Sequence, residues 1–184
     1  MEMKSIRSLR PNVTREEAIR MFSAPGPASF LWKLRRGPLQ RIADAYIPFN
    51  LYRVAYHMGG APHSHLFALD AVDGSLDLFE FGVAPSDAET VHVSTRNHPA
   101  ARLSSSKAEE LLREKVLRLI FQQGFFKVRA VKLEIERLPG EIHLPYWLGF
   151  YGTHENLRCR VMDAVRRRVE GARASALFEQ WLAA

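Results

Sequence analysis

Three histidines lie close together in the segment YHMGGAPHSHL, residues 56–66. His63 and His65 form a His-x-His pair, and His57 precedes them across two glycines. Imidazole nitrogens are common ligands of zinc and other borderline metals, so this group is a candidate metal site. No fourth ligand stands at a diagnostic spacing, although Asp70 is nearby. Three solvated histidines in a polar loop would give the same pattern, and we assign no metal or other cofactor.

A second candidate site is basic and lies near the C-terminus. Guanidinium groups bind phosphates through paired hydrogen bonds, and nearby aromatic rings can stack on bases. Tyr146 and Trp147 lie close by in sequence, so single-stranded nucleic acid is one candidate partner. The net charge of +6 agrees with an anionic partner, but it also fits arginines scattered on solvated faces, and no nucleic-acid-binding signature is present. The arginines are Arg158, Arg160, Arg166, Arg167, Arg168 and Arg173, with Arg35 and Arg36 as a distant pair.

The single cysteine is a poor candidate for a nucleophile. A catalytic thiolate needs a stabilising cation or helix N-terminus, and a base such as His143 or His154. Cys159 instead alternates with Leu157 and Val161, as a buried residue of a strand does. We therefore predict no catalytic residue in this chain.

Aspartates mark two predicted turns. Asp73 and Gly74 stand between two alternating apolar runs, and Asp-Gly in that position predicts a β-hairpin. Asp70 and Asp163 are expected to accept backbone hydrogen bonds and to fix the geometry of their turns. The alternative is a pair of carboxylates that share acid and base roles.

Three segments of the sequence predict helices. Thr14 is suited to the N-cap of the first, with Glu17 as its capping-box partner, and the prolines of residues 24–27 should end it. Ser106 is the predicted N-cap of a longer helix, in which apolar residues recur at helical spacing. The last segment, 171–184, also carries apolar residues on one helical face.

The remaining segments predict antiparallel strands. Residues 39–58 are rich in β-branched and aromatic residues, and Pro48 within them indicates a bulge or an edge. Residues 59–65 are expected to form a loop, and 91–98 a short strand. Further strands are expected on both sides of a turn at 139–140 and around Cys159.

The two halves of the chain resemble each other. Three landmarks recur in the same order at offsets of 92 to 97 residues: a helix start, a proline-bearing strand and a strand-to-turn junction. Their ordered agreement predicts an internal duplication. The matched segments are 14–17 with 106–110, 46–49 with 143–146, and 70–72 with 163–165.

The strand-turn segment DAVDGSL, residues 70–76, resembles the corresponding motif of PepSY domains. The resemblance implies one helix packed on a curled antiparallel sheet in a cystatin-like manner, sometimes in tandem. It covers about a dozen residues in each copy and carries no activity over to this chain. In the second copy Arg167 stands where the first has Gly74, and an arginine at positive φ would be strained. We therefore expect that second turn to have another shape.

Together these patterns predict an α+β fold of two tandem similar units, residues 1–100 and 101–184. Each unit would pack a helix on an antiparallel sheet, with a shared core and a C-terminal helix. No apolar run is long enough to span a bilayer, and no secretory signal is present, so we expect a soluble, cytoplasmic protein of bacterial type.

The aromatic segments YIPFNLYRVAY and LPYWLGFY hold more rings than a small sheet must bury. These rings can fill a shared core, line a small-ligand pocket or form a dimer interface. The main functional prediction is a binding or interaction module without a catalytic site, which engages a protein partner or a second copy of itself. The alternatives are a nucleic-acid-binding protein that uses the arginine cluster, and a small-ligand-binding protein or enzyme with an aromatic pocket.

Overall fold

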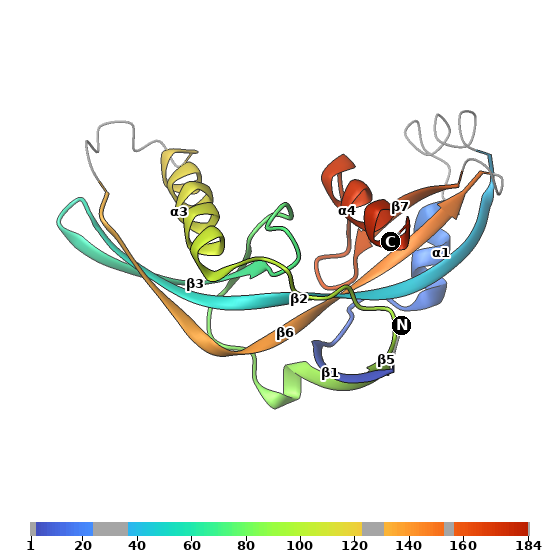
Figure 1. The fold of residues 1–184 in the computed structure, drawn as a ribbon, viewed down its shortest axis with the longest axis horizontal. Helices are drawn as coiled ribbons and strands as arrows, with labels where there is room; N and C mark the ends of the chain where they lie inside the picture. Colours follow the sequence, from blue (N-terminus) through green and yellow to red (C-terminus); the bar gives the residue numbers. More distant parts are fainter. Residues whose placement is uncertain (1–2, 24–36, 123–130, 153–156, 184) are drawn as a thin grey trace. The chain divides into compact units, whose positions relative to one another are not determined.

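The computed structural model describes residues 3–23, 37–122, 131–152 and 157–183. Within them the fold is α+β, as predicted, with three helices and a mixed sheet (Figure 1). The helices are α1 (Arg15–Ser23), α3 (Ser105–Gln122) and α4 (Ala172–Ala183), with a short 3₁₀ helix η1 (Asp87–Glu89). The strands are β1 (Lys4–Leu9), β2 (Leu39–Met58), β3 (Ala61–Asp70), β4 (Phe79–Phe81), β5 (Thr90–Thr95), β6 (Leu133–Tyr151), β7 (Arg158–Asp163) and β8 (Arg168–Val169).

The strand order is β4-β3-β2-β6-β1-β5, with β7 paired to β6 and β8 paired to β7. Antiparallel ladders join β2 to β3, β3 to β4, β1 to β5 and β6 to β7. The contact of β1 with β6 is parallel and pairs Ser8 with His143. The predicted antiparallel meander of the first half is therefore confirmed as β2-β3-β4.

The chain divides into two compact units. Unit 1 comprises residues 1–47, 89–99 and 143–184, and unit 2 comprises residues 48–88 and 100–142. Both long strands, β2 and β6, contribute residues to both units. As a result, each unit combines segments from both halves of the sequence.

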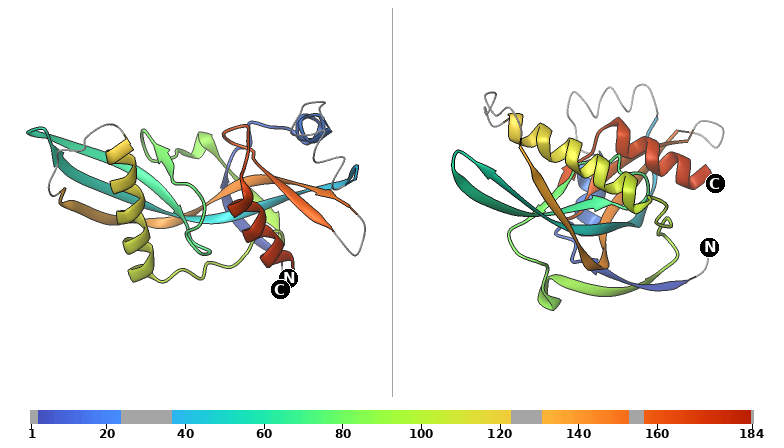
Figure 2. Two further views of the ribbon diagram at one scale, coloured as in Figure 1. Left: turned by 90° about the horizontal axis from the view of Figure 1, so that it is seen from above. Right: turned by 60° about the vertical axis from the view of Figure 1, so that its left-hand side comes forward.

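Unit 2 is built from α3 and the β2-β3 hairpin, which lie against each other in Figure 2. Every fourth residue of α3 is buried, while alternate residues of β2 face the helix, as the periods of helix and strand require. This packing buries the apolar surface that neither element could cover alone. The buried set is Ala108, Leu112, Val116 and Ile120 on α3, with Tyr52, Val54, Tyr56 and Met58 on β2 and Phe67 and Leu69 on β3.

The start of α3 differs from the prediction. The N-cap is Ser104, whose carbonyl accepts a hydrogen bond from Ala108 N at 2.9 Å and whose hydroxyl lies 3.4 Å from Lys107 N. Ser106, the predicted N-cap, is already helical. The sequence offers three consecutive serines, and the first of them is the N-cap in the structure.

The predicted loop at 59–65 is wrong, because β3 begins at Ala61. Gly59 and Gly60, at φ values of 59° and 81°, join β2 directly to β3. Both glycines adopt the left-handed conformation that a tight two-residue hairpin turn requires. The following histidines therefore lie in strands and not in a loop.

Two other predicted turns also differ. The tight turn at Asp73-Gly74 is wrong, because residues 71–78 form a longer connection between β3 and β4. The turn at 139–140 is wrong as well, since β6 continues through both residues with Gly140 at a φ of 91°. In both places glycine supplies a local irregularity without reversing the chain within two residues.

Unit 1 packs α1 against the β6-β7 hairpin. The predicted capping box of α1 is confirmed: Thr14 N donates to Glu17 at 2.9 Å, and Glu17 N donates to the Thr14 hydroxyl at 3.2 Å. Phe22 of α1 is fully buried, and its ring would lie 3.0 Å from a Cβ at Gly149. Glycine at position 149 thus allows the helix to approach the strand closely. The C-terminal helix, α4, is confirmed and buries Ala174, Leu177 and Phe178.

Candidate functional site

The three predicted histidines lie on the β2-β3 hairpin of unit 2. His57 is near the end of β2, and His63 and His65 are on β3. The ring of Tyr56 stacks on both β3 histidines, with centroid distances of 5.2 Å to His63 and 5.8 Å to His65. His65 in turn stacks on Phe67 at 5.8 Å. The hairpin therefore carries a continuous row of aromatic and imidazole rings.

A hydrogen-bonded chain fixes the middle of this row. Glu80 Oε1 lies 2.7 Å from His65 Nδ1, and His65 Nε2 lies 3.3 Å from the Tyr56 hydroxyl. Burial, and the nearby charge of Glu80, raise the pKa of Tyr56. Its phenol therefore stays protonated at neutral pH, and the chain orients the ring instead of activating it as a nucleophile.

A cavity of about 210 Å³ opens beside this row. Tyr56, His57, Pro62 and His63 of the hairpin contribute to its walls. The opposite wall is formed by Glu134 at the start of β6 and by Lys132 just before that strand. Pockets for drug-sized ligands measure roughly 300–1,000 Å³, so this cavity suits a smaller molecule.

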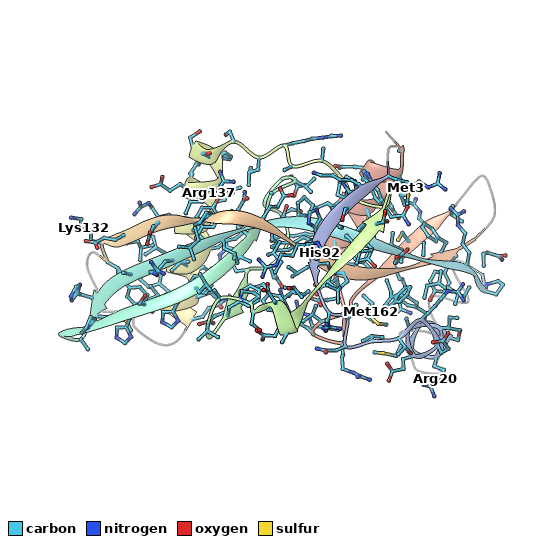
Figure 3. All side chains as sticks on the ribbon, turned by 90° about the horizontal axis from the view of Figure 1, so that it is seen from below. Met3, Arg20, His92, Lys132, Arg137 and Met162 are labelled. Atoms are coloured by element: carbon cyan, nitrogen blue, oxygen red, sulfur yellow. The ribbon has the colours of Figure 1, made fainter. Side chains whose placement is uncertain are left out.

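Two opposite charges line the same cavity. Lys132 (labelled in Figure 3) and Glu134 stand two residues apart, about 7 Å along an extended chain. The next acidic residue, Glu136, forms a 2.7 Å ion pair with Arg53 of β2. No such pair joins Lys132 or Glu134 to another residue in the described part of unit 2. Both groups are exposed and can meet a ligand.

The described residues contain no group of three His, Cys, Asp or Glu side chains that could hold a metal ion. His65 already bonds Glu80 and Tyr56, so two of its possible bonds are used within the protein. The arrangement of the hairpin histidines thus favours hydrogen bonding and stacking over metal coordination.

The C-terminal arginines form ion pairs within unit 1. These carboxylates compete with a phosphate for the guanidinium groups. Arg160 instead lies with its Cζ 6.0 Å from the centre of the Phe22 ring, and Arg173 is exposed on α4. Arg35 and Arg36 lie outside the described residues. The ion pairs are Arg158 with Glu179, Arg166 with Asp163, Arg167 with Glu17, and Arg168 with Glu170.

The aromatic residues proposed to accompany those arginines belong to the interior of unit 1. Tyr146 is 3% exposed and packs on Phe178 at a centroid distance of 5.5 Å. Trp147 is half-buried, and its indole N–H donates to the Val13 carbonyl at 2.9 Å. Rings held in this way do not present the free faces on which bases stack.

Asp70 organises the connection after β3. Its side chain is fully buried and accepts four backbone hydrogen bonds, three on Oδ1 and one on Oδ2. Burial raises the pKa of its carboxyl, and the amides of the connection oppose that rise. The donors are the backbone N–H groups of Val72, Asp73, Gly74 and Leu76, at 2.9–3.2 Å.

Asp163 fills the same role after β7. Its Oδ1 accepts hydrogen bonds from the backbone N–H groups of Val165 and Arg166, both at 2.8 Å. Arg167 follows at a φ of 57°, close to the 72° of Gly74. The expectation of a different shape is therefore wrong at this residue. The Arg167 guanidinium bonds the Asn12 carbonyl at 2.8 Å and Glu17 at 3.1 Å, and these contacts offset the backbone strain.

Cys159 is buried at 2% exposure. Burial, with a smaller contribution from Glu179, raises the pKa of its thiol to about 12. The thiolate that nucleophilic catalysis requires is thus strongly disfavoured. Of the two bases considered for it, His143 is buried beside β1, and His154 lies outside the described residues.

The sequence reasoning missed the charged wall of the cavity. Lys132 and Glu134 were part of a predicted strand, and no local pattern distinguishes them from ordinary solvated charges. Glu80 was missed for the same reason, since its contact with His65 depends on the pairing of β3 with β4. The charged residues alternate along 132–136, as they also do on the solvated face of an ordinary strand.

No protein-family model matches this chain, and neither a curated protein nor a solved structure matches it. Among the helices of the described residues, none combines the length and apolar character needed to cross a lipid bilayer.

Proposed function

We propose that this protein is a binding module whose cavity on unit 2 takes a small zwitterionic molecule of the α-amino-acid type. The observation that carries the proposal is the pair of opposite charges on the wall of the cavity, Lys132 and Glu134. Neither has an ion-pair partner among the described residues. A ligand with one carboxylate and one ammonium group would complete both.

The chemistry of the lining favours a zwitterion over a simple anion or cation. A lone carboxylate would gain Lys132 but would be repelled by Glu134, and a lone amine would have the opposite problem. Charge-assisted hydrogen bonds are roughly twice as strong as neutral ones, so satisfying both groups gives specificity as well as affinity. The imidazole of His57 adds a further hydrogen-bonding group to the lining.

The hydrogen-bonded chain of Glu80, His65 and Tyr56 supports the same proposal indirectly. It fixes the side chains of Tyr56 and His65 on the hairpin that forms one wall of the cavity. A side chain fixed in advance loses little conformational entropy on binding, which improves affinity without a new contact.

A thermal-shift screen of the standard α-amino acids, each at millimolar concentration, tests the proposal. Ligands that bind only the folded state raise the melting temperature. We expect at least one amino acid to do so, while its carboxylate-only and amine-only analogues do not. The absence of a shift with every amino acid would refute the proposal.

The matched variants are Glu134→Gln and Glu136→Gln. Both remove one carboxylate from the same strand face, but Glu136 is paired to Arg53 and does not line the cavity. We expect Glu134→Gln and Lys132→Gln to abolish the shift, and Glu136→Gln to keep it. Equal loss of the thermal shift in Glu134→Gln and Glu136→Gln would mean that binding depends on the strand as a whole and not on the charge pair.

We also propose that the two halves of the chain arose by duplication of a helix-on-hairpin segment of the PepSY-like, cystatin-like kind. Matching hydrogen bonds support this: Ala71 N donates to the Pro48 carbonyl at 2.8 Å, and Ala164 N donates to the Pro145 carbonyl at 3.1 Å. The Ala71 and Ala164 carbonyls both accept backbone bonds from the segment preceding a helix. The donors are Arg102 and Leu103 before α3, and Asn12 before α1.

Under this proposal each helix packs on the hairpin of the other half, because α3 joins β2-β3 and α1 joins β6-β7. Such an exchange agrees with the predicted shared core of the halves 1–100 and 101–184. Nucleic-acid binding by the arginine cluster remains the alternative function, and the internal ion pairs of that cluster count against it.

A further inference from the structure

The strand β5, in unit 1, ends one side of the sheet. Its six residues all pair with β1, from Lys4 with Thr95 to Leu9 with Thr90. No strand of the described chain pairs with the other edge of β5. The other terminal strands are shorter, with three residues in β4 and two in β8. Of these three terminal strands, β5 therefore presents the longest open edge.

The sequence of β5, TVHVST, has none of the usual protections of an edge strand. Natural edges are shielded by lysine, proline, bulges or inward charges, because an open row of N–H and C=O groups invites another strand. Here four of the six residues are β-branched, and none is proline or charged at neutral pH. Such an edge is suited to pairing with a further strand.

The chain fixes the end of β5 but does not cover its middle with another strand. Asn97 accepts a hydrogen bond from Tyr46 N at 2.9 Å, and its amide donates to Asp44 at 3.2 Å. Within the strand, His92 and Ser94 are exposed, while Val91 and Val93 are half-buried. Figure 3 labels His92 on the side of the molecule seen from below.

We propose that β5 pairs antiparallel with β5 of a second copy of this chain. A two-fold axis through His92 places Val91 opposite Val93 of the other copy, twice, and Thr90 opposite Ser94. Val91 and Val93, both half-buried, thus share one face of the paired strands. Thr90, His92 and Ser94 share the other face, on which Thr90 is buried and His92 and Ser94 are exposed. The two central histidines lie opposite each other.

The charges at the ends of β5 favour the same occupant. Glu89 precedes the strand, Arg96 follows it, and both are exposed. Antiparallel pairing brings the acidic end of one copy beside the basic end of the other, at both ends of the interface. An unrelated strand would need the same order of charges to gain as much.

The test is the molar mass in solution, measured by sedimentation over a range of concentrations. We expect the wild type to approach twice the 21.0 kDa of the chain as concentration rises. His92→Lys and His92→Glu each place like charges opposite each other across the two-fold axis, so each should raise the dissociation constant at least tenfold. Mixing the two variants should restore a dimer, because opposite charges then meet.

Ser5→Lys is the control. Ser5 is exposed on β1, where it pairs with Ser94 of β5, and it lies away from the open edge of β5. It should leave the dimer unchanged. A wild type that stays monomeric at every concentration would overturn the proposal. So would a dimer that persists in both His92 variants, because it would use another surface.

Discussion

The turn after β3 and the turn after β7 share a buried aspartate and a later residue at positive φ, but the residue at positive φ differs between them. In unit 2, Asp70 accepts four backbone hydrogen bonds, and Gly74 takes the positive φ. In unit 1, Asp163 accepts two, and Arg167 takes the positive φ instead. The buried aspartate is thus the common element, and the residue at positive φ is interchangeable where side-chain contacts offset the strain.

The two turns also differ in what surrounds them. A Cβ at Gly74 would lie 2.5 Å from Leu111 Cδ1, so unit 2 leaves little room for a side chain there. Arg167 extends to Asn12 and Glu17, at the start of α1. The arginine therefore links its turn to the helix of unit 1, which glycine could not do.

Removal of a large, fully buried side chain should have the largest effect on stability. Phe22→Ala in unit 1 should lower the free energy of unfolding by about 4 kcal/mol, and Leu112→Ala in unit 2 by about 3 kcal/mol. Both side chains are fully buried between their own helix and the strands that it packs on. Urea unfolding followed by circular dichroism measures both. A cost below about 1 kcal/mol at either site would mean that its helix does not hold the hairpin.

The stability costs of replacing the two aspartates should differ, because the two substitutions leave different numbers of backbone N–H groups without an acceptor. Asp70→Ala should cost about 4 kcal/mol and Asp163→Ala about 2 kcal/mol, because four and two N–H donors respectively lose their acceptor. The same urea experiment applies. Asp70→Asn, which keeps one carbonyl oxygen, should fall between Asp70→Ala and the wild type. Equal costs at the two positions would remove the distinction between the turns.

A buried histidine should make stability depend on pH. Burial, with smaller contributions from His98 and Lys4, lowers the pKa of His143 from its ordinary 6.5 to about 4, although a backbone bond with Arg7 opposes the shift. The unfolded chain therefore binds a proton at a higher pH than the folded chain does. This contribution is fully present above pH 6.5 and is lost as pH falls towards 4, by about 3 kcal/mol in total.

Unfolding free energies at intervals between pH 7 and pH 4 measure this slope, with His143→Gln as the comparison. We expect the variant to have a shallower slope than the wild type over the same interval. Parallel slopes for the two proteins would mean that other groups carry the pH dependence.

The smallest effects should come from exchanging the residues at positive φ. Gly74→Ala should cost about 2 kcal/mol, from backbone strain and the approach to Leu111. Arg167→Gly should change stability by less than about 1 kcal/mol, because relief of strain offsets the lost contacts with Asn12 and Glu17. Chemical denaturation measures the unfolding free energy of both variants. A cost above about 1 kcal/mol for Arg167→Gly would show that the contacts of Arg167 stabilise the fold by more than its backbone strain destabilises it.

The sequence predicted those features of the fold that depend on neighbouring residues. The capping box at Thr14, the helix from 105 to 122 and the aspartate of each turn all follow from patterns within a few positions. The two-glycine turn at Gly59 was missed because the histidines after it were read as a polar loop. The continuity of β6 through Pro139 was missed because partner strands decide whether such a residue ends a strand.

The candidate site was predicted only in part, for a related reason. His57 and His63 do line the cavity, but Lys132 lies about 70 residues away in sequence and meets them only through the sheet. The arginines looked like a free basic surface because their carboxylate partners, such as Glu17 and Glu179, come from other elements. Pairing between distant elements, which no local pattern encodes, decided both cases.

A calorimetric titration with the amino acid that gives the largest thermal shift would test the central claim most directly. The cavity of unit 2 depends on charges that have no described counterpart in unit 1, so the account predicts one bound molecule per chain and at least tenfold weaker binding in Lys132→Gln. A stoichiometry of two, or binding that Lys132→Gln leaves unchanged, would contradict it.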